Sequence, residues 1–430
     1  MNSIGIDIGT TSICGICADC ESGEILKSVT LSNDSFIETD KAFERIQDSE
    51  KILKKVFDLV ERLADKDTVS IGFSNQMHGI LYTDKEGNAL SPLYIWQDTR
   101  GNEIYKDGKT YAETIGGFAG YGLVTDFYNR ENCLVPQNTA FCMSIGDYAT
   151  MKLCGKREPL MHITNGAAFG CFDIIESKFT VDLPYLPKIT KDFSVVGEYK
   201  GIPVTVSVGD NQASFIGSVK NNETALINVG TGSQVSVICD SADVGEGLEA
   251  RPFDGEKYLA AGCALCGGRA FAMVERFFAR VVEIATGEKP ESIYPEIDKI
   301  LESKKETSMK ADSRFCGTRL DPTVTGSFSG ITENNFTPED MLLSTLYAMT
   351  DELYRMYASS GKKCVSLVCS GNGIRKNAAL REITSKTFGC KVQMPFYKEE
   401  AAYGAALTSM AGAKIKTLND ARHLIRYKGE

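Results

Sequence analysis

One pattern occurs twice in the chain, and this repeat constrains the fold more than any other feature. Residues 4–18 and residues 225–239 each contain an apolar strand-like run, a Gly-Thr turn with a following serine, and a second apolar run. A repeat at about half the length of a 430-residue chain predicts two domains of related topology. The polar run at residues 220–223 is the expected boundary, so we divide the chain into an N-terminal domain, residues 1–220, and a C-terminal domain, residues 221–430.

The first copy of the repeat carries a carboxylate inside its apolar run. Asp7 lies between two isoleucines and is followed by the turn Gly9-Thr10-Thr11-Ser12. Burying a lone carboxylate costs free energy unless the group is paired or holds a cation. Turn N–H groups and hydroxyls suit a phosphate. The segment is therefore either a metal–phosphate site or a hairpin in which Asp7 caps a turn, and the repeat favours the site.

Four glycine-rich breaks follow predicted buried strands, at residues 9–12, 209–212, 230–233 and 371–373. Ligand sites in open α/β sheets form at such strand ends. Two hydroxyl-bearing hairpins that face each other across a cleft would clamp the phosphates of a nucleotide, and Gly371-Asn372-Gly373 would let a flat base approach the backbone. A single break of this kind is usually only a turn, but four breaks in duplicated halves indicate a ligand site.

Asp210 follows a run of apolar β residues and begins a predicted helix. It has two interpretations that the sequence leaves open. As a helix N-cap it would bind backbone N–H groups. As a general base it would accept the proton of a hydroxyl that attacks phosphorus.

Two further polar clusters end early strands, Gln76-Met77-His78 and Trp96-Gln97-Asp98. The only tryptophan of the chain lies in the second cluster, and an aromatic face beside amide, imidazole and carboxylate groups suits a polyhydroxylated ligand. A lone histidine is more often a structural residue, but the neighbouring Gln76 and Asp98 favour a binding role for His78.

Composition excludes several classes of protein. A formal net charge of −10 argues against a nucleic-acid partner. No apolar run approaches the roughly 18 residues of a membrane span, and the N-terminus has no targeting segment, so we expect a cytoplasmic protein with no membrane partner. We interpret the fourteen cysteines as structural thiols, with a metal or cluster site at Cys14/Cys17 or Cys263/Cys266 as the alternative.

The order and spacing of these motifs resemble those of the FGGY carbohydrate kinases, in the actin/Hsp70/hexokinase superfamily. Residues 5–12 and 228–233 resemble the two phosphate motifs of the family, residues 76–79 its sugar motif, and residues 209–213 its catalytic-base motif. Residues 371–375 and 399–406 resemble the adenosine site. The resemblance implies an α/β fold with two duplicated ribonuclease H-like (actin-like ATPase) domains that face each other across a cleft. It also implies that the N-terminal domain binds sugar and the C-terminal domain binds nucleotide.

Carried over by position, the resemblance assigns a role to each candidate residue. Asp210 would be the general base, and Asp7 would hold Mg²⁺ as the cofactor, with ATP as co-substrate. The residues that would line the sugar pocket are Gln76, Met77, His78, Trp96 and Asp98. Those that would contact the nucleotide are Thr10, Thr11, Ser12, Gly230, Thr231, Gly371, Asn372 and Gly373.

Within this family, Gln76-Met77-His78-Gly79 resembles the branch that acts on ketoses, and Trp96-Gln97-Asp98 looks more like the sedoheptulose type. The resemblance therefore implies a ketose partner, most specifically sedoheptulose phosphorylated on its terminal hydroxyl. The alternatives are a xylulose kinase and, from another class, an ATP-hydrolysing activator of the same fold. A homodimer is the one protein partner we envisage. Asn75 stands where the family usually has glycine, which predicts a narrower sugar pocket.

Overall fold

The computed structural model describes residues 1–303, 305–319 and 321–429. Its contacts divide the chain into two compact units. The first unit consists of Met1–Asn221, Arg251–Tyr258 and Glu399–Arg426, and the second of Asn222–Ala250, Leu259–Lys398 and the residues from Tyr427 onward. The break after Asn221 lies beside the boundary expected from the sequence, whereas two later segments that we assigned to the C-terminal domain group with the first unit.

A six-stranded sheet forms the centre of the first unit. In spatial order its strands are β16 (Val195–Tyr199), β17 (Ile202–Gly209), β6 (Thr68–Asn75), β1 (Asn2–Ile8), β2 (Ser12–Asp19) and β3 (Ile25–Ser32). The strands β1, β6 and β17 are parallel, and Asn75 is in register with both Ile8 and Gly209. The carboxyl ends of these three strands therefore meet at one edge of the sheet, where a ligand site of an α/β fold is expected.

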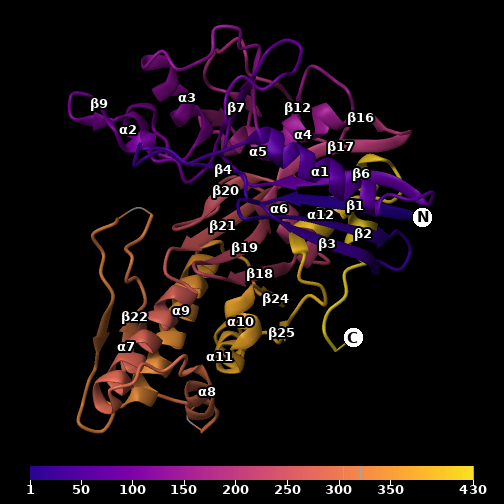
Figure 1. Cartoon of the computed structure of the whole chain (residues 1–430). Helices are drawn as coiled ribbons and strands as arrows, with labels where there is room; N and C mark the ends of the chain where they lie inside the picture. Colours follow the sequence, from indigo (N-terminus) through magenta and orange to yellow (C-terminus); the bar gives the residue numbers. More distant parts are fainter. Residues whose placement is uncertain (304, 320, 430) are drawn as a thin grey trace. The chain divides into compact units, whose positions relative to one another are not determined.

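Helix α12 (Glu400–Gly412) explains why the last segment joins the first unit. It packs on β1, β6 and α6 (Asp210–Ser218), and Figure 1 shows it in yellow beside the indigo strands β1 and β2. Glycines make this close approach possible. A Cβ at Gly5 would lie 1.9 Å from the carbonyl oxygen of Ala402, and one at Gly72 would lie 2.0 Å from that of Ala405. The sequence signal for this packing is the small-residue composition of the helix, which does not identify its partner.

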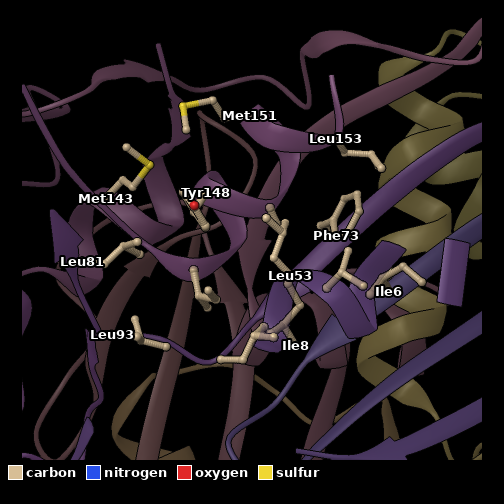
Figure 2. Close-up of a cluster of buried hydrophobic side chains, with 14 of the residues drawn as sticks. Ile6, Ile8, Leu53, Phe73, Leu81, Leu93, Met143, Tyr148, Met151 and Leu153 are labelled. Carbon is tan, nitrogen blue, oxygen red and sulfur yellow. The ribbon is translucent and has the colours of Figure 1, made fainter. Parts of the chain in front are cut away.

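A hydrophobic core fills the space between the sheet and α1 (Ser49–Leu63) in the first unit (Figure 2). Asp48 caps α1 by accepting hydrogen bonds from the N–H groups of Glu50 and Lys51. The labelled core side chains in Figure 2 are Ile6, Ile8, Leu53, Phe73, Leu81, Leu93, Met143, Tyr148, Met151 and Leu153. This core supports the edge of the sheet at which β1 and β6 end.

Shorter elements complete the first unit. They are β4 (Phe36–Ile37), β5 (Ile46–Gln47), β7 (Leu81–Thr83), β8 (Leu93–Tyr94), η1 (Arg100–Asn102), β9 (Ile104–Lys106), β10 (Lys109–Thr110), α2 (Tyr111–Ile115), α3 (Gly122–Glu131), β11 (Phe141–Met143), α4 (Ile145–Leu153), β12 (Leu160–His162), α5 (Ile163–Ala168), β13 (Phe172–Asp173), β14 (Lys178–Phe179), β15 (Lys188–Thr190) and α13 (Leu418–Arg422).

The second unit repeats this sheet topology. Its strand order is β20 (Glu249–Pro252), β21 (Tyr258–Ala264), β19 (Ser233–Cys239), β18 (Thr224–Val229), β24 (Ser366–Ser370) and β25 (Val392–Gln393). As in the first unit, an antiparallel hairpin, here β18–β19, is followed in space by a parallel strand, β24, next to its first member. The predicted duplication is therefore confirmed at the level of the sheets.

The remaining elements of the second unit are α7 (Gly268–Thr286), α8 (Tyr294–Ser303), β22 (Lys310–Asp312), β23 (Ser327–Ser329), α9 (Pro338–Ser359), α10 (Asn372–Lys376) and α11 (Ala378–Phe388). Thr337 caps α9 by accepting from the N–H of Asp340. Within the described ranges of the chain, no helix combines the length and the apolar character needed to cross a membrane.

Candidate functional site

Asp7 and Asp210 both belong to the edge of the first sheet at which the parallel strands end. Asp7 is the penultimate residue of β1, and its Oδ1 accepts a hydrogen bond of 2.9 Å from the hydroxyl of Ser74 on β6. Asp210 is the first residue of α6, directly after β17. The N-cap of α6 is Gly209, with no side-chain capping bond. Asp210 is therefore not the N-cap residue of α6, which was one of its two interpretations.

The charge of Asp7 acts on Asp210. Burial raises the pKa of Asp7 to about 6. Burial, followed by the charge of Asp7, raises the pKa of Asp210 to about 7, while the charge of Arg251 and the N–H of Asn211 act in the opposite direction. A carboxyl group whose pKa lies near neutrality can hold or release a proton at physiological pH, which is the property required of a general base.

This pair of carboxylates fits a divalent cation, because hard oxygen ligands and an excess of negative charge suit Mg²⁺. Burial is the main cause of both raised pKa values, and a bound cation would stabilise the charged form of each group. In residues 1–303, 305–319 and 321–429, no group of three or more histidine, cysteine or acidic side chains is placed to hold a metal alone. Mg²⁺ commonly takes only one or two protein carboxylates and completes its shell with water and phosphate oxygens.

Arg251 is a residue near Asp210 that the sequence analysis missed. It is buried on β20, a strand of the second sheet whose last two residues, Arg251 and Pro252, group with the first unit. The side-chain amide of Gln212 on α6 donates to the carbonyl oxygen of Pro252 over 3.0 Å, which ties this segment to the helix that begins with Asp210. No local motif marks Arg251, since its proximity depends on a segment of the second half of the sequence returning to the first unit.

Thr10, Gln76 and Trp96 form one hydrogen-bonded group. The hydroxyl of Thr10 donates to Oε1 of Gln76 over 2.9 Å and accepts from Nε1 of Trp96 over 3.0 Å. Gln47 closes the group, because its Nε2 donates to the carbonyl oxygen of Thr10 and its Oε1 accepts from Gln76. The structure thus brings the first turn and both predicted sugar clusters together. Trp96 remains 48% exposed, so part of its ring is open to a ligand.

The other two residues of the first turn lie differently. Thr11 is exposed and Ser12 is partly buried. The turn itself is held by its backbone, since the N–H of Gly9 donates to the carbonyl oxygen of Ser12 over 3.0 Å. Asn33 also supports it by donating from Nδ2 to the carbonyl oxygen of Gly9 over 2.8 Å.

His78 is held in a strained backbone conformation, with φ at 73°. Its Nδ1 lies 2.6 Å from the carbonyl oxygen of Ala168, which ends α5, and its ring stacks on Tyr121 with centroids 4.7 Å apart. Since a carbonyl oxygen only accepts, the hydrogen must be on Nδ1. Strain maintained by neighbouring contacts is typical of functional sites.

Two glycine-containing loops supply these contacts. The N–H of Leu123 donates to the carbonyl oxygen of Phe169 over 2.8 Å and so joins the loops at residues 116–122 and 165–170. Met77, the residue before His78, is buried against the end of β17, where a Cβ at Gly209 would lie 3.0 Å from its sulfur. The sugar motif is therefore adjacent to the residue that precedes Asp210.

Asp98 differs from the other predicted sugar residues in its hydrogen-bond partners. It is fully buried, and its two oxygens accept four hydrogen bonds, three from Arg100 and one from the N–H of Arg45. Four bonds fill the acceptor capacity of a carboxylate. In this arrangement Asp98 has no acceptor left for a sugar hydroxyl and instead neutralises a buried guanidinium.

Asn75 lies in a buried network rather than along a pocket wall. Its Oδ1 accepts from the hydroxyl of Ser207 over 2.6 Å and from Nδ2 of Asn165 over 3.1 Å. Its Nδ2 donates to the carbonyl oxygen of Gln76 over 2.7 Å. The network joins β6 to β17 and α5, so the side chain stabilises the sheet edge instead of narrowing a pocket as the sequence suggested.

In the second unit, three glycine-rich turns meet by backbone contacts. The N–H of Gly268, at the start of α7, donates to the carbonyl oxygen of Gly230, and that of Arg269 donates to the carbonyl oxygen of Thr231, each over 3.0 Å. A Cβ at Gly371, whose φ is 87°, would lie 2.5 Å from the carbonyl oxygen of Val229. Thr231 and Asn372 are exposed beside these turns.

Backbone that is bare of side chains at a strand end suits the close approach of phosphate or a flat base. The structure therefore gathers the predicted residues 230, 231 and 371–373. It adds Gly267 and Gly268, which the sequence analysis did not identify.

Comparison with known proteins decides the family. Residues 2–116 match the N-terminal domain of the FGGY family of carbohydrate kinases, and residues 225–413 match its C-terminal domain. The chain belongs to the FGGY family of carbohydrate kinases. It is therefore a carbohydrate kinase, and the family to which it belongs implies ATP as co-substrate.

Individual FGGY relatives are distant but extend over the whole chain. Sedoheptulokinase of Mus musculus is 23% identical over 95% of this chain and 97% of its own length. A xylulose kinase of Staphylococcus xylosus is 22% identical over 97% of this chain and 92% of its own length. The solved structure of a ligand-bound xylulose kinase from Lactobacillus acidophilus superposes with a TM-score of 0.83 at 18% identity and covers 99% of this chain and 92% of that chain. These matches confirm the predicted actin-like α/β fold.

Proposed function

We propose that this FGGY kinase transfers the γ-phosphoryl group of ATP to the terminal hydroxyl of a ketose, with sedoheptulose as the preferred acceptor. The observation that carries the proposal is the packing of Met77 against Gly209, which places the sugar motif next to the residue before Asp210. A base adjacent to the acceptor site is the arrangement that phosphorylation of a hydroxyl needs.

In this proposal Asp210 accepts the proton of the attacking hydroxyl. A pKa raised to about 7 by burial and by the charge of Asp7 makes it a competent acceptor near neutral pH. The charge of Arg251 partly opposes this rise in the pKa of Asp210. His78 and Gln76 orient the acceptor, and their own positions are fixed by Ala168 and Thr10. Correct orientation contributes more to such a reaction than the base does.

Asp7 is the residue we assign to Mg²⁺, which would neutralise phosphate charge when it is bound. Thr10, Thr11 and Ser12 of the first turn, and Gly230 and Thr231 of the second, are assigned to the phosphates. The backbone of residues 371–373 is assigned to the adenosine. The second unit is thus assigned to the nucleotide, and the first unit to the sugar and the base.

The choice of sedoheptulose over xylulose rests on the similarity of the Trp96-Gln97-Asp98 cluster to the sedoheptulose type and on the match to sedoheptulokinase over nearly the full length of both chains. The structure restricts what this cluster contributes. Trp96 presents an exposed ring joined to Thr10, whereas Asp98 is occupied by Arg100. We therefore assign recognition to Trp96 and a supporting role to Asp98.

A panel of ketoses with Mg²⁺ and ATP, followed by release of ADP, tests the proposal. We expect kcat/KM for sedoheptulose to exceed that for xylulose by about tenfold, equivalent to about 1.4 kcal/mol of transition-state binding. A higher value for xylulose would identify the alternative substrate. ADP release that no sugar stimulates above the water-only rate would exclude the ketose kinase altogether.

A further inference from the structure

Two cysteines that are far apart in the sequence meet in the second unit. The sulfur of Cys266, next to the start of α7, lies 3.6 Å from that of Cys316, in the segment between β22 and β23. Cys266 is only 2% exposed, whereas Cys316 is partly exposed. The Cys-x-x-Cys spacing made Cys263 and Cys266 an alternative metal or cluster site, but Cys263 contacts Oε1 of Gln234 over 3.3 Å.

A positive charge makes the two thiols unequal. Nη1 of Arg269, in the first turn of α7, lies 3.6 Å from the sulfur of Cys316. This arginine, followed by the thiol of Cys266, is what lowers the pKa of Cys316, and burial raises the pKa of Cys266 to about 12. Arg269 and Cys266 are the titratable or charged groups that act on Cys316. The thiolate, which is the reactive form of cysteine, therefore forms on the more exposed sulfur.

We propose that Cys316 and Cys266 are an oxidant-reactive dithiol, with Cys316 as the nucleophile and Cys266 as the resolving thiol. The co-reactant is a hydroperoxide. The Cys316 thiolate attacks one peroxide oxygen, the O–O bond breaks, and the other oxygen leaves and takes up a proton, so that Cys316 becomes a sulfenic acid. The Cys266 sulfur then gives up its proton and attacks the Cys316 sulfur, which forms the S–S bond and releases water. Two thiols are oxidised by two electrons and one hydroperoxide is reduced.

The two sulfurs start 3.6 Å apart and must approach to about 2.05 Å to form a disulfide. The bond would join the β22–β23 segment to the start of α7. That start packs closely on the turn at Gly232, because a Cβ at Gly267 would lie only 2.4 Å from the carbonyl carbon of Gly232.

This position gives the modification a consequence that rests on the proposed function. The residues that follow Cys266 hold the turn assigned to the phosphates, since the N–H groups of Gly268 and Arg269 donate to the carbonyl oxygens of Gly230 and Thr231. Oxidation would restrain this contact and remove the thiolate partner of Arg269. We expect the KM for ATP to rise about threefold or more upon oxidation and to recover with dithiothreitol.

The chain contains a matched internal control. Cys364 and Cys390 are also neighbours, with the sulfur of Cys390 3.2 Å from the carbonyl oxygen of Cys364. Burial, followed by the neighbouring Cys390, raises the pKa of Cys364 to about 12. No arginine is among the causes of that shift. This close pair, in which no arginine acts on Cys364, separates the effect of charge from the effect of proximity.

The experiment treats the reduced full-length protein with hydrogen peroxide, alkylates the remaining thiols and maps disulfides by mass spectrometry of peptides. We expect a Cys266–Cys316 crosslink that dithiothreitol reverses, while Cys364 and Cys390 stay alkylated. C316S must abolish the crosslink. R269M must slow crosslink formation about threefold to tenfold at an unchanged melting temperature. The reason is that Cys316 without the arginine is less often a thiolate, while the thiolate that remains is a stronger nucleophile.

Two results would overturn the inference. One is a disulfide between Cys364 and Cys390 that forms before the one between Cys266 and Cys316. The other is a rate of Cys266–Cys316 crosslinking that R269M leaves unchanged. Either result would show that Arg269 does not activate the Cys316 thiol. Because peptide mapping needs no catalysis, this outcome is independent of whether the protein phosphorylates a ketose. A crosslink that leaves the KM for ATP unchanged would instead overturn the link to the phosphate turn.

Discussion

The hydroxyl of Thr10 donates to the side-chain oxygen of Gln76 over 2.9 Å and accepts from Trp96 over 3.0 Å, so a residue of the first turn holds both sugar clusters. T10V removes both bonds while keeping the shape of the side chain. We expect a rise of about tenfold in the KM for the ketose and a loss of about 1–2 kcal/mol in the free energy of unfolding. Steady-state kinetics and denaturant unfolding measure these. T10S, which keeps the hydroxyl, is the control, and equal defects in the two variants would contradict the role of the bonds.

Asp210 is the residue on which the proposed chemistry depends. D210N keeps the size of the side chain but cannot accept a proton, so we expect kcat to fall by about 10²- to 10⁴-fold. The affinity for the ketose, measured by calorimetry without ATP, should change less than about threefold, since binding does not need the base. An enzyme that keeps more than a tenth of its kcat would exclude Asp210 as the base.

The same substitution predicts a pH-dependent gain in stability. The pKa of Asp210 is raised from 3.8 to about 7 in the folded protein, mainly by burial. Between these values the folded state keeps a proton that the unfolded state releases, so folding stability falls as the pH rises through this window and stays low above it. Without ligand and with EDTA, D210N should melt about 2 °C or more above the wild type at pH 8 and match it at pH 4. D243N, at an exposed carboxylate, is the control substitution.

The regular parts of the fold were the easiest to predict. The repeated hairpin identified both sheets, because apolar strands and Gly-Thr turns are local signals. What could not be predicted depends on tertiary contacts. The strands end in register at Asn75, but the return of residues 251–258 and 399–426 to the first unit has no local signal. Arg251 was missed for this reason, and the contact of Cys316 with Cys266 likewise has no local signal.

Asp98 illustrates the limit for the site itself. Its place after Trp96 predicted a sugar ligand, but sequence spacing does not reveal that Arg100, two residues later, turns back onto it. The guanidinium of Arg100 is buried against the ring of Tyr94, at 4.3 Å from its centroid, and needs a counter-charge. The polar cluster predicted that Asp98 binds the sugar, but in the structure Asp98 neutralises the buried cation of Arg100.

The role of Asp98 as a partner of Arg100 predicts a stability defect. D98N leaves a buried guanidinium short of its main counter-charge and should lower the free energy of unfolding by about 3–5 kcal/mol. Because Asp98 has no acceptor left for a ligand, the KM of the folded fraction for the ketose should change less than about twofold. The double variant D98N/R100M should be less destabilised than the sum of the two single variants. A stable D98N protein with a greatly raised KM would restore Asp98 as a sugar ligand.

Tyr121 is a positioning residue for His78. Its ring stacks on the imidazole at an interplanar angle of 7° and opposes any rotation of a residue whose backbone is strained. Y121A should raise the KM for the ketose about tenfold. The KM for ATP should stay within about twofold of the wild-type value, because we assign ATP binding to the other unit. Y121F keeps the stacked ring and is the matched control. Nuclear magnetic resonance of the imidazole signals supplies a readout apart from activity, since His78 should lose its single ordered environment in Y121A but not in Y121F. If Y121F raises the KM for the ketose as much as Y121A does, the site requires the hydroxyl of Tyr121 and not the stacking of its ring.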